Sequence, residues 1–125
     1  MAPRFTLDEA RNLLPALREH AERIVRLRAD LADASAALRT GSQPAGGIPE
    51  VKALEANLQE AIDWFTAHGI ELKGIAPLIV DLPSELDGEP MLLCWLEGEA
   101  SIGWYHPAAT GFMGRRRLPR SPGDR

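Results

Sequence analysis

The densest group of chemically versatile side chains lies between residues 92 and 106, in the stretch LLCWLEGEASIGWYH. His106 closes this stretch, and a neutral imidazole there could bind a metal or move a proton. Glu99 offers a carboxylate that could act as a metal ligand or a base, and Trp104 offers an apolar wall. The plainer interpretation is a well-packed hairpin, in which His106 bonds the backbone and Glu99 is an exposed turn residue.

Three more polar residues belong to the same candidate region. Lys73 and Asp81 lie at the two ends of the preceding strand region, where each is either a solvated charge or part of the polar edge of a pocket. Arg115 closely follows Gly114, and its guanidinium fork could hold a carboxylate or a phosphate. Together these residues predict a polar pocket at the rim of a sheet.

A metal centre receives little support from the sequence. Helical zinc and iron sites usually show close pairs such as His-x-x-x-His or Glu-x-x-His, and the chain has neither. Cys94 and His106 could approach each other across a hairpin, but two ligands are too few for a tight site. The chain also lacks a phosphate-binding loop and a Gly-x-Ser-x-Gly elbow. Cys94 sits in an apolar strand, which is a poor place for a reactive thiolate.

From residue 70 onward the sequence has the period of β-strands. IELKGI, PLIVDLP, PMLLCWL and ASIGWYH are short, rich in β-branched or aromatic residues and separated by Gly and Pro. We expect about three antiparallel strands over residues 70–106, with an Asp-Gly turn in SELDGE and Gly98 in the last turn. Alternation along the last strand puts Trp104 and His106 on the same face.

Both faces of this last hairpin are largely apolar, so both must be covered. Cover could come from a wrapping segment at residues 107–114, from the start of the first helix or from another subunit. The last two together are favoured, which predicts a homodimer.

Two amphipathic helices precede the sheet and form a predicted hairpin over residues 6–69. Thr6 and Glu9 supply a capping box at the first helix start. Apolar residues then recur at heptad spacing, as in a coiled coil. GSQPAGGIP breaks the pattern and predicts a loop, and Gly69 is suited to end the second helix. The two helices should pair antiparallel.

Length and charge bound the class of protein. The 125 residues fit one domain, predicted over residues 1–114, followed by a basic, disordered tail over residues 115–125. The last twelve residues hold five arginines against one aspartate, whereas the rest of the chain holds nine basic and seventeen acidic residues, a net charge of −8. That acidic body argues against nucleic acid as a partner.

Compartment and membrane contact follow from simple features. The single Cys94 cannot form an internal disulfide, which fits a reducing cytoplasm. The first twenty residues carry charges throughout and show no signal peptide, and the longest apolar run, MLLCWL, is too short to cross a membrane as a helix. We therefore expect a cytoplasmic protein without membrane contact.

The order of elements resembles a bacterial family known as domain of unknown function 2203 (DUF2203). The matching blocks are FTLDEARNLLPAL, GIELKGI with LIVDLP, and LLCWLEGEASIGWYHPAATGFMGR, over roughly residues 5–116. The positions that the resemblance implies as a signature are Lys73, Asp81, Cys94, Trp95, Gly98, Glu99, His106, Gly111, Gly114 and Arg115. Members commonly carry acidic residues where this chain has Gly74 and PAAT. The family has no settled activity, so the resemblance implies a fold rather than a function.

The sequence thus predicts an α+β domain in which a long antiparallel two-helix hairpin packs on a small three-stranded antiparallel sheet. The first functional hypothesis is a non-catalytic binding or assembly module with a pocket for an anionic small molecule or peptide. In it Arg115 neutralises the anion, Trp104 forms a wall and His106 donates a hydrogen bond. The second is a metal-dependent enzyme that uses His106 as a ligand and Glu99 as ligand or base. A third has these residues serve only dimer packing. No cofactor follows from the sequence.

Overall fold

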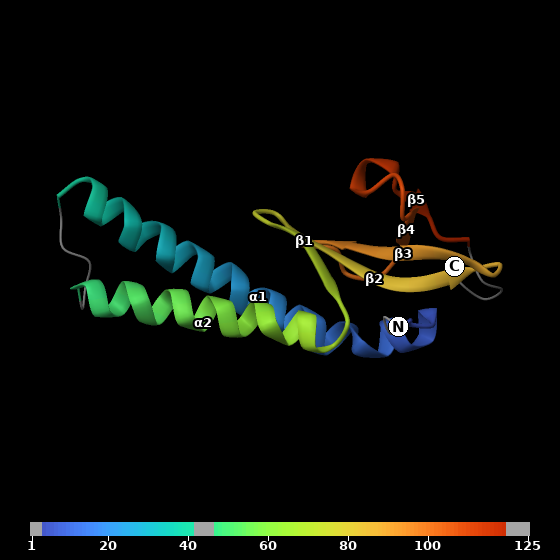
Figure 1. Ribbon diagram of the computed structural model, residues 1–125, viewed down its shortest axis with the longest axis horizontal. Helices are drawn as coiled ribbons and strands as arrows, with labels where there is room; N and C mark the ends of the chain where they lie inside the picture. The colour runs from blue at the N-terminus through green and yellow to red at the C-terminus, as the bar shows by residue number, and fades with distance from the viewer. Residues whose placement is uncertain (1–3, 42–46, 120–125) are drawn as a thin grey trace. The chain divides into compact units, whose positions relative to one another are not determined.

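The computed structural model describes residues 4–41 and 47–119. Its elements, in chain order, are α1 (Leu7–Arg39), α2 (Gly47–Ala67), β1 (Glu71–Ile75), β2 (Leu78–Leu86), β3 (Glu89–Leu96), β4 (Trp104–Pro107), the 3-10 helix η1 (Phe112–Gly114) and β5 (Arg116–Arg117) (Figure 1). The α+β class is confirmed. The chain divides into two compact units: Ala16–His68 is a helical unit, and the residues up to Pro15 join the chain from Gly69 onward in a sheet unit.

The sheet unit holds five antiparallel strands in the order β1-β2-β3-β4-β5, so the prediction of three strands is wrong in number. The first predicted strand region folds back at Ala76–Pro77, a cis peptide bond, and gives two strands, β1 and β2. The fifth strand is a pair of arginines without apolar periodicity, which forms because its backbone pairs with β4. The sequence places these arginines in a disordered tail, whose last residues, 120–125, lie outside the described part.

The turn between β2 and β3 is the one that the Asp-Gly pair predicts. Asp87 and Gly88 both have positive φ angles, 52° and 81°, as a two-residue hairpin turn of this type requires. The turn leads directly from Leu86 to Glu89, the first partners of the hairpin. A tight turn of this kind fixes which residues of the two strands face each other.

One row of cross-strand partners runs across all five strands. Its members are Glu71, Asp81, Cys94, Trp104 and Arg117. Directly opposed residues project from the same face of a sheet, and His106, which pairs with Leu92 on β3, shares that face. We call this side of the sheet the polar face. The predicted common face of Trp104 and His106 is therefore confirmed.

The opposite face of the sheet is apolar and closed. Its central side chains are almost fully buried: Val80, Leu82, Met91, Leu93 and Trp95. The residues before α1 are tied to this unit, because Phe5 N–H donates to Pro83 O and the Ser84 hydroxyl donates to Phe5 O. Figure 1 shows the first turns of α1 on one side of the strands and η1 on the other. The wrapping segment predicted at residues 107–114, which contains η1, thus covers that second side of the strands from within the chain, one of the options that the sequence left open.

The helical unit pairs α1 and α2 antiparallel, as predicted. His20 stacks on Trp64 with ring centroids 4.1 Å apart, and Arg23 lies 3.8 Å from Glu60. The later residue of α1 therefore contacts the earlier residue of α2, which means that the two helices run in opposite directions. None of the described helices is long and apolar enough to span a membrane.

Candidate functional site

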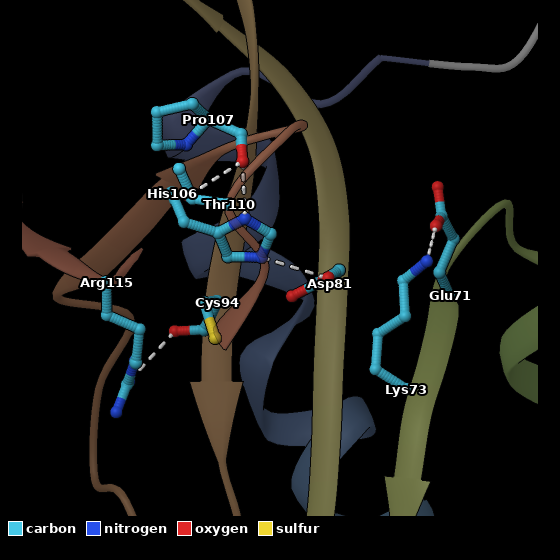
Figure 2. Close-up of polar contacts among 8 residues, drawn as sticks. All are labelled: Glu71, Lys73, Asp81, Cys94, His106, Pro107, Thr110 and Arg115. Atoms are coloured by element: carbon cyan, nitrogen blue, oxygen red, sulfur yellow. Dashed lines mark hydrogen bonds and ion pairs between the residues drawn. The ribbon is translucent and has the colours of Figure 1, made fainter. Parts of the chain in front are cut away.

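Three potential metal ligands converge at the centre of the polar face. Asp81 on β2 faces Cys94 on β3, and His106 on β4 approaches the same point (Figure 2). One ligand atom from each lies within 4.8 Å of the other two. The residues are 1%, 0% and 1% exposed. The strands thus bring together a carboxylate, a thiol and an imidazole out of contact with solvent.

The hydrogen bonds of His106 define where its protons lie. Its Nδ1 is 2.8 Å from Pro107 O, and since a carbonyl only accepts, Nδ1 must donate. Its Nε2 is 3.0 Å from Asp81 Oδ2. The proton of this second contact belongs either to an imidazolium or to a carboxyl group. Asp81 Oδ1 is buried and has no hydrogen-bond partner, and leaving a buried polar atom in that state destabilises the fold.

Cys94 is a protonated thiol near neutral pH. Burial, with a smaller contribution from the negative charge of Asp81, raises its pKa from 9.0 to about 12, while the positive charge of Arg115 opposes the shift. Cys94, His106 and Asp81 also do not form a nucleophilic triad. In such a triad one imidazole nitrogen faces the nucleophile and the other the acid, whereas here Nδ1 is held by a backbone carbonyl. The cluster is therefore suited to binding an ion rather than to attacking a substrate.

Arg115 and Glu99 form a second group next to this cluster. The Arg115 guanidinium donates to Glu99 Oε1 at 2.6 Å and to Cys94 O at 3.3 Å, and it lies 4.7 Å from the centroid of the Trp104 ring. Glu99 Oε1 also accepts from Leu96 N–H at 2.7 Å. The sequence assigned Arg115 and Glu99 to separate roles, as anion binder and as metal ligand or base. In the structure each neutralises the other.

Lys73 is the one predicted site residue that stands apart. It is exposed on β1, and its Nζ lies 2.8 Å from the carboxylate of Glu71 (Figure 2). The hydrogen bond to Glu71 raises the pKa of Lys73, with smaller contributions from the charges of Glu71 and Asp81. The six predicted residues therefore form three groups. Asp81 contacts His106, and Glu99 pairs with Arg115, whose guanidinium lies against the Trp104 ring. Lys73 belongs to neither group and pairs with Glu71.

Sequence reasoning missed that Cys94 completes the Asp81–His106 pair. The information was present in the turn. In a two-residue hairpin, partners lie at equal distances from the turn, and Asp81 precedes Asp87 by as many residues as Cys94 follows Gly88. The Asp-Gly signal, taken with strand alternation, was enough to place this carboxylate opposite the thiol.

Comparison with known proteins gives a family but no characterised relative. Residues 4–118, nearly the whole chain, match the model of a family described as uncharacterized conserved protein (DUF2203). No curated protein and no solved structure matches the chain.

Proposed function

We propose that this chain, which belongs to the DUF2203 family of uncharacterised conserved proteins, binds a divalent transition-metal ion through Asp81, Cys94 and His106. The observation that carries the proposal is the buried convergence of three ligand atoms within 4.8 Å of one another, one of them on a carboxylate whose second oxygen has no partner. A metal ion there would take the place of the hydrogen bond between His106 and Asp81 and would satisfy the carboxylate whose second oxygen has no partner.

The donor set favours zinc, cobalt or iron over magnesium and calcium. Thiolate and imidazole are ligands for borderline and soft ions, whereas magnesium and calcium take oxygen ligands and keep several waters. A divalent ion would also be balanced in charge by the Asp81 carboxylate and the Cys94 thiolate. The ion and its ligands would then carry no net charge, and a site without net charge costs the least free energy to bury.

The spacing of the side chains is close to that of a tetrahedral site. Zinc bonds of ~2.0–2.3 Å hold two ligand atoms roughly 3.3–3.7 Å apart. His106 Nε2 and Asp81 Oδ2 are 3.0 Å apart, and all three ligand atoms lie within 4.8 Å. Binding therefore needs small side-chain adjustments, while Nδ1 keeps its bond to Pro107 O and orients the ring, as ligating histidines usually require.

Burial favours a non-catalytic role for the ion. All three ligands are at most 1% exposed, so a substrate has no access to the metal without a rearrangement. The ligands come from the adjacent strands β2, β3 and β4. The ion therefore joins three strands, and its binding energy adds to the stability of the folded sheet.

The first two of the three hypotheses drawn from the sequence receive less support from these contacts. A pocket for an anion around Trp104, His106 and Arg115 stays a prediction, but His106 turns inward to Asp81 and the charge of Arg115 is already matched by Glu99. A metal site made of His106 and Glu99 also stays a prediction. The contacts instead group His106 with Asp81 and a cysteine, and that set is the one proposed here.

Calorimetric titration of chelator-treated protein with zinc tests the proposal. We expect about one zinc per chain in the wild type. Asp81→Asn, Cys94→Ser and His106→Gln should each weaken binding by more than about a hundredfold, because each removes a ligand rather than a supporting contact. His68→Gln is the matched control, because His68 is an exposed histidine that follows α2 and whose side-chain bond is to Trp64 O in the last turn of that helix.

Circular dichroism of each variant shows whether it folds. Asp81→Asn is the most informative change, because the amide keeps the shape of the side chain and can donate to His106 Nε2 while losing the carboxylate. A folded wild type that takes up no zinc, or a folded Asp81→Asn protein with unchanged affinity, would exclude this function.

A further inference from the structure

The outer edge of β5 is a second feature that the metal proposal does not use. Within the described residues, β5 ends the sheet and pairs with β4 alone, through Trp104 opposite Arg117 and Tyr105 opposite Arg116. A terminal strand has backbone N–H and C=O groups on its free side that can pair with another extended chain. This edge is therefore a possible place for a partner to add as a further strand.

The two side chains of β5 carry charge that the described residues do not neutralise. Arg115 has Glu99 at 2.6 Å. Neither Arg116 nor Arg117 forms an ion pair within residues 4–41 and 47–119, and both are exposed. The Arg117 guanidinium lies 5.0 Å from the centroid of the Trp104 ring, which holds it against the polar face. Successive residues of a strand point to opposite faces, so the edge presents one cation on each side.

An exposed apolar side chain accompanies these charges. Met113 on η1 is 91% exposed, the most exposed large apolar residue of the described part. Figure 1 shows η1 beside β4 and β5, and η1 contacts β4. A methionine is flexible and can adapt to different partners. The surface thus combines an open strand edge, two cations and one apolar contact.

A second copy of the same chain does not fit this edge. Antiparallel pairing of β5 with its counterpart would bring arginines opposite arginines, and like charges placed directly opposite are destabilising. Nucleic acid fits poorly as well, because its phosphates continue along the strand past the two arginines and meet the rest of the chain, which apart from its last twelve residues carries −8. A short peptide needs only two carboxylates, which the two arginines can match. Carboxylates on an extended peptide match both the charge and the strand geometry.

We infer that the β5 edge is a docking site for an extended acidic peptide. The peptide backbone adds to the sheet, and two consecutive acidic residues reach Arg116 on one face and Arg117 on the other. This inference is independent of the metal site, since neither arginine contacts Asp81, Cys94 or His106 through a hydrogen bond or ion pair.

Fluorescence anisotropy with a labelled Thr-Val-Glu-Glu-Val-Thr peptide tests the inference. We expect binding that weakens with salt, and no binding of the peptide with glutamine in place of glutamate. Changing Arg116→Gln and Arg117→Gln together should weaken binding about tenfold, the effect of two exposed ion pairs. Arg18→Gln is the matched control, because Arg18 is an exposed arginine of the helical unit.

Chemical-shift changes on peptide addition should be confined to β4, β5 and the neighbouring Leu118. Four outcomes overturn the inference: no binding of the glutamate peptide by the wild type, equal binding of the glutamate and glutamine peptides, equal binding by the double variant and the wild type, or tighter binding of a single-stranded oligonucleotide than of the peptide. A double variant that aggregates, together with a wild type that binds no peptide, shows instead that the arginines only protect the edge.

Discussion

Asp81 is an acidic residue in the middle of a strand whose neighbours are fully buried. Val80 and Leu82 beside it are 0% exposed, and Asp81 itself is 1% exposed. The sequence identified Asp81 and His106 as polar candidates but placed them at an open rim. Strand alternation predicts which side chains share a face, yet it does not tell how well later segments cover that face. The covering segment, residues 107–115, has no periodic pattern from which its path could be predicted.

Replacing Asp81 by alanine should destabilise the sheet unit strongly. Removing one partner of a buried hydrogen-bonded pair leaves the other partner without compensation, which costs about 1–3 kcal/mol for a neutral pair and about 3–5 kcal/mol for a charged one. Urea unfolding of metal-free protein, followed by tryptophan fluorescence, measures the change. Glu71→Ala is the control, since Glu71 is the cross-strand partner of Asp81 but lies in a half-exposed ion pair with Lys73, and its loss should cost less than about 1 kcal/mol. Equal effects of the two changes would contradict the buried pairing.

Cys94 should be inert towards alkylating reagents in the folded protein. Its pKa of about 12 leaves almost no thiolate at pH 8, and the side chain is fully buried. Mass spectrometry after iodoacetamide treatment should show modification only in denaturant. Rapid modification of the native protein would contradict the environment described for this thiol.

The raised pKa of the Cys94 thiol also makes the stability of the protein depend on pH. The folded pKa is raised above the ordinary 9.0, so the folded state holds the proton more tightly than the unfolded state. The stabilisation that comes from this tighter proton binding is complete below pH 9 and is lost as pH rises towards about 12. A Cys94→Ala protein should lack this part of the alkaline loss, which denaturant unfolding at several pH values measures by difference.

At the scale of elements, local signals predicted helix starts and turns well. Thr6 and Glu9 form the expected reciprocal cap, with Glu9 N–H donating to Thr6 Oγ1 at 3.0 Å and Thr6 N–H donating to Glu9 Oε1 at 2.9 Å. The Asp87–Gly88 turn was predicted equally well, because the positive φ angles that it requires depend only on the two turn residues themselves. β5 was not predictable in this way, since it exists through long-range pairing with β4.

Thr6→Ala should destabilise the protein by about 1 kcal/mol, the usual cost of losing an N-terminal cap. Thermal unfolding measures the change, and Thr40→Ala, at the other end of α1, is a threonine control that bonds only preceding carbonyls. The cap also has a pH signature. Hydrogen bonds from Thr6 lower the pKa of Glu9 below 4.5, so its contribution is present above that pH and is lost as the pH falls below it. A Thr6→Ala protein with unchanged stability would show that the cap is energetically unimportant.

At the scale of the whole molecule, the described chain divides into two compact units of different composition. The helical unit holds a seam of apolar residues, and the sheet unit holds every residue of the candidate site. The boundary on the first helix follows Pro15, the residue that interrupts its backbone hydrogen bonds. The homodimer predicted from the apolar hairpin remains a prediction, and light scattering of the purified protein would measure it. Length, charge and composition alone predicted neither the division into units nor the buried cluster of Asp81, Cys94 and His106.

Metal binding should stabilise the protein as a whole-molecule property. A ligand that binds only the folded state raises the free energy of unfolding by about 2.7 kcal/mol when it is present at a hundred times its dissociation constant. Differential scanning calorimetry with and without zinc should therefore show an upward shift of the transition that contains the sheet unit. Calcium and magnesium should give no shift, and an equal shift with either of them would contradict the donor set.

The most direct measurement is the absorption spectrum of the protein loaded with cobalt. A cobalt ion held by Asp81, Cys94 and His106 gives an intense thiolate-to-metal band in the near ultraviolet and visible bands typical of tetrahedral coordination. The band should disappear in Cys94→Ser, and it should persist in His68→Gln. A cobalt-titrated wild type that shows no thiolate band would contradict the metal site.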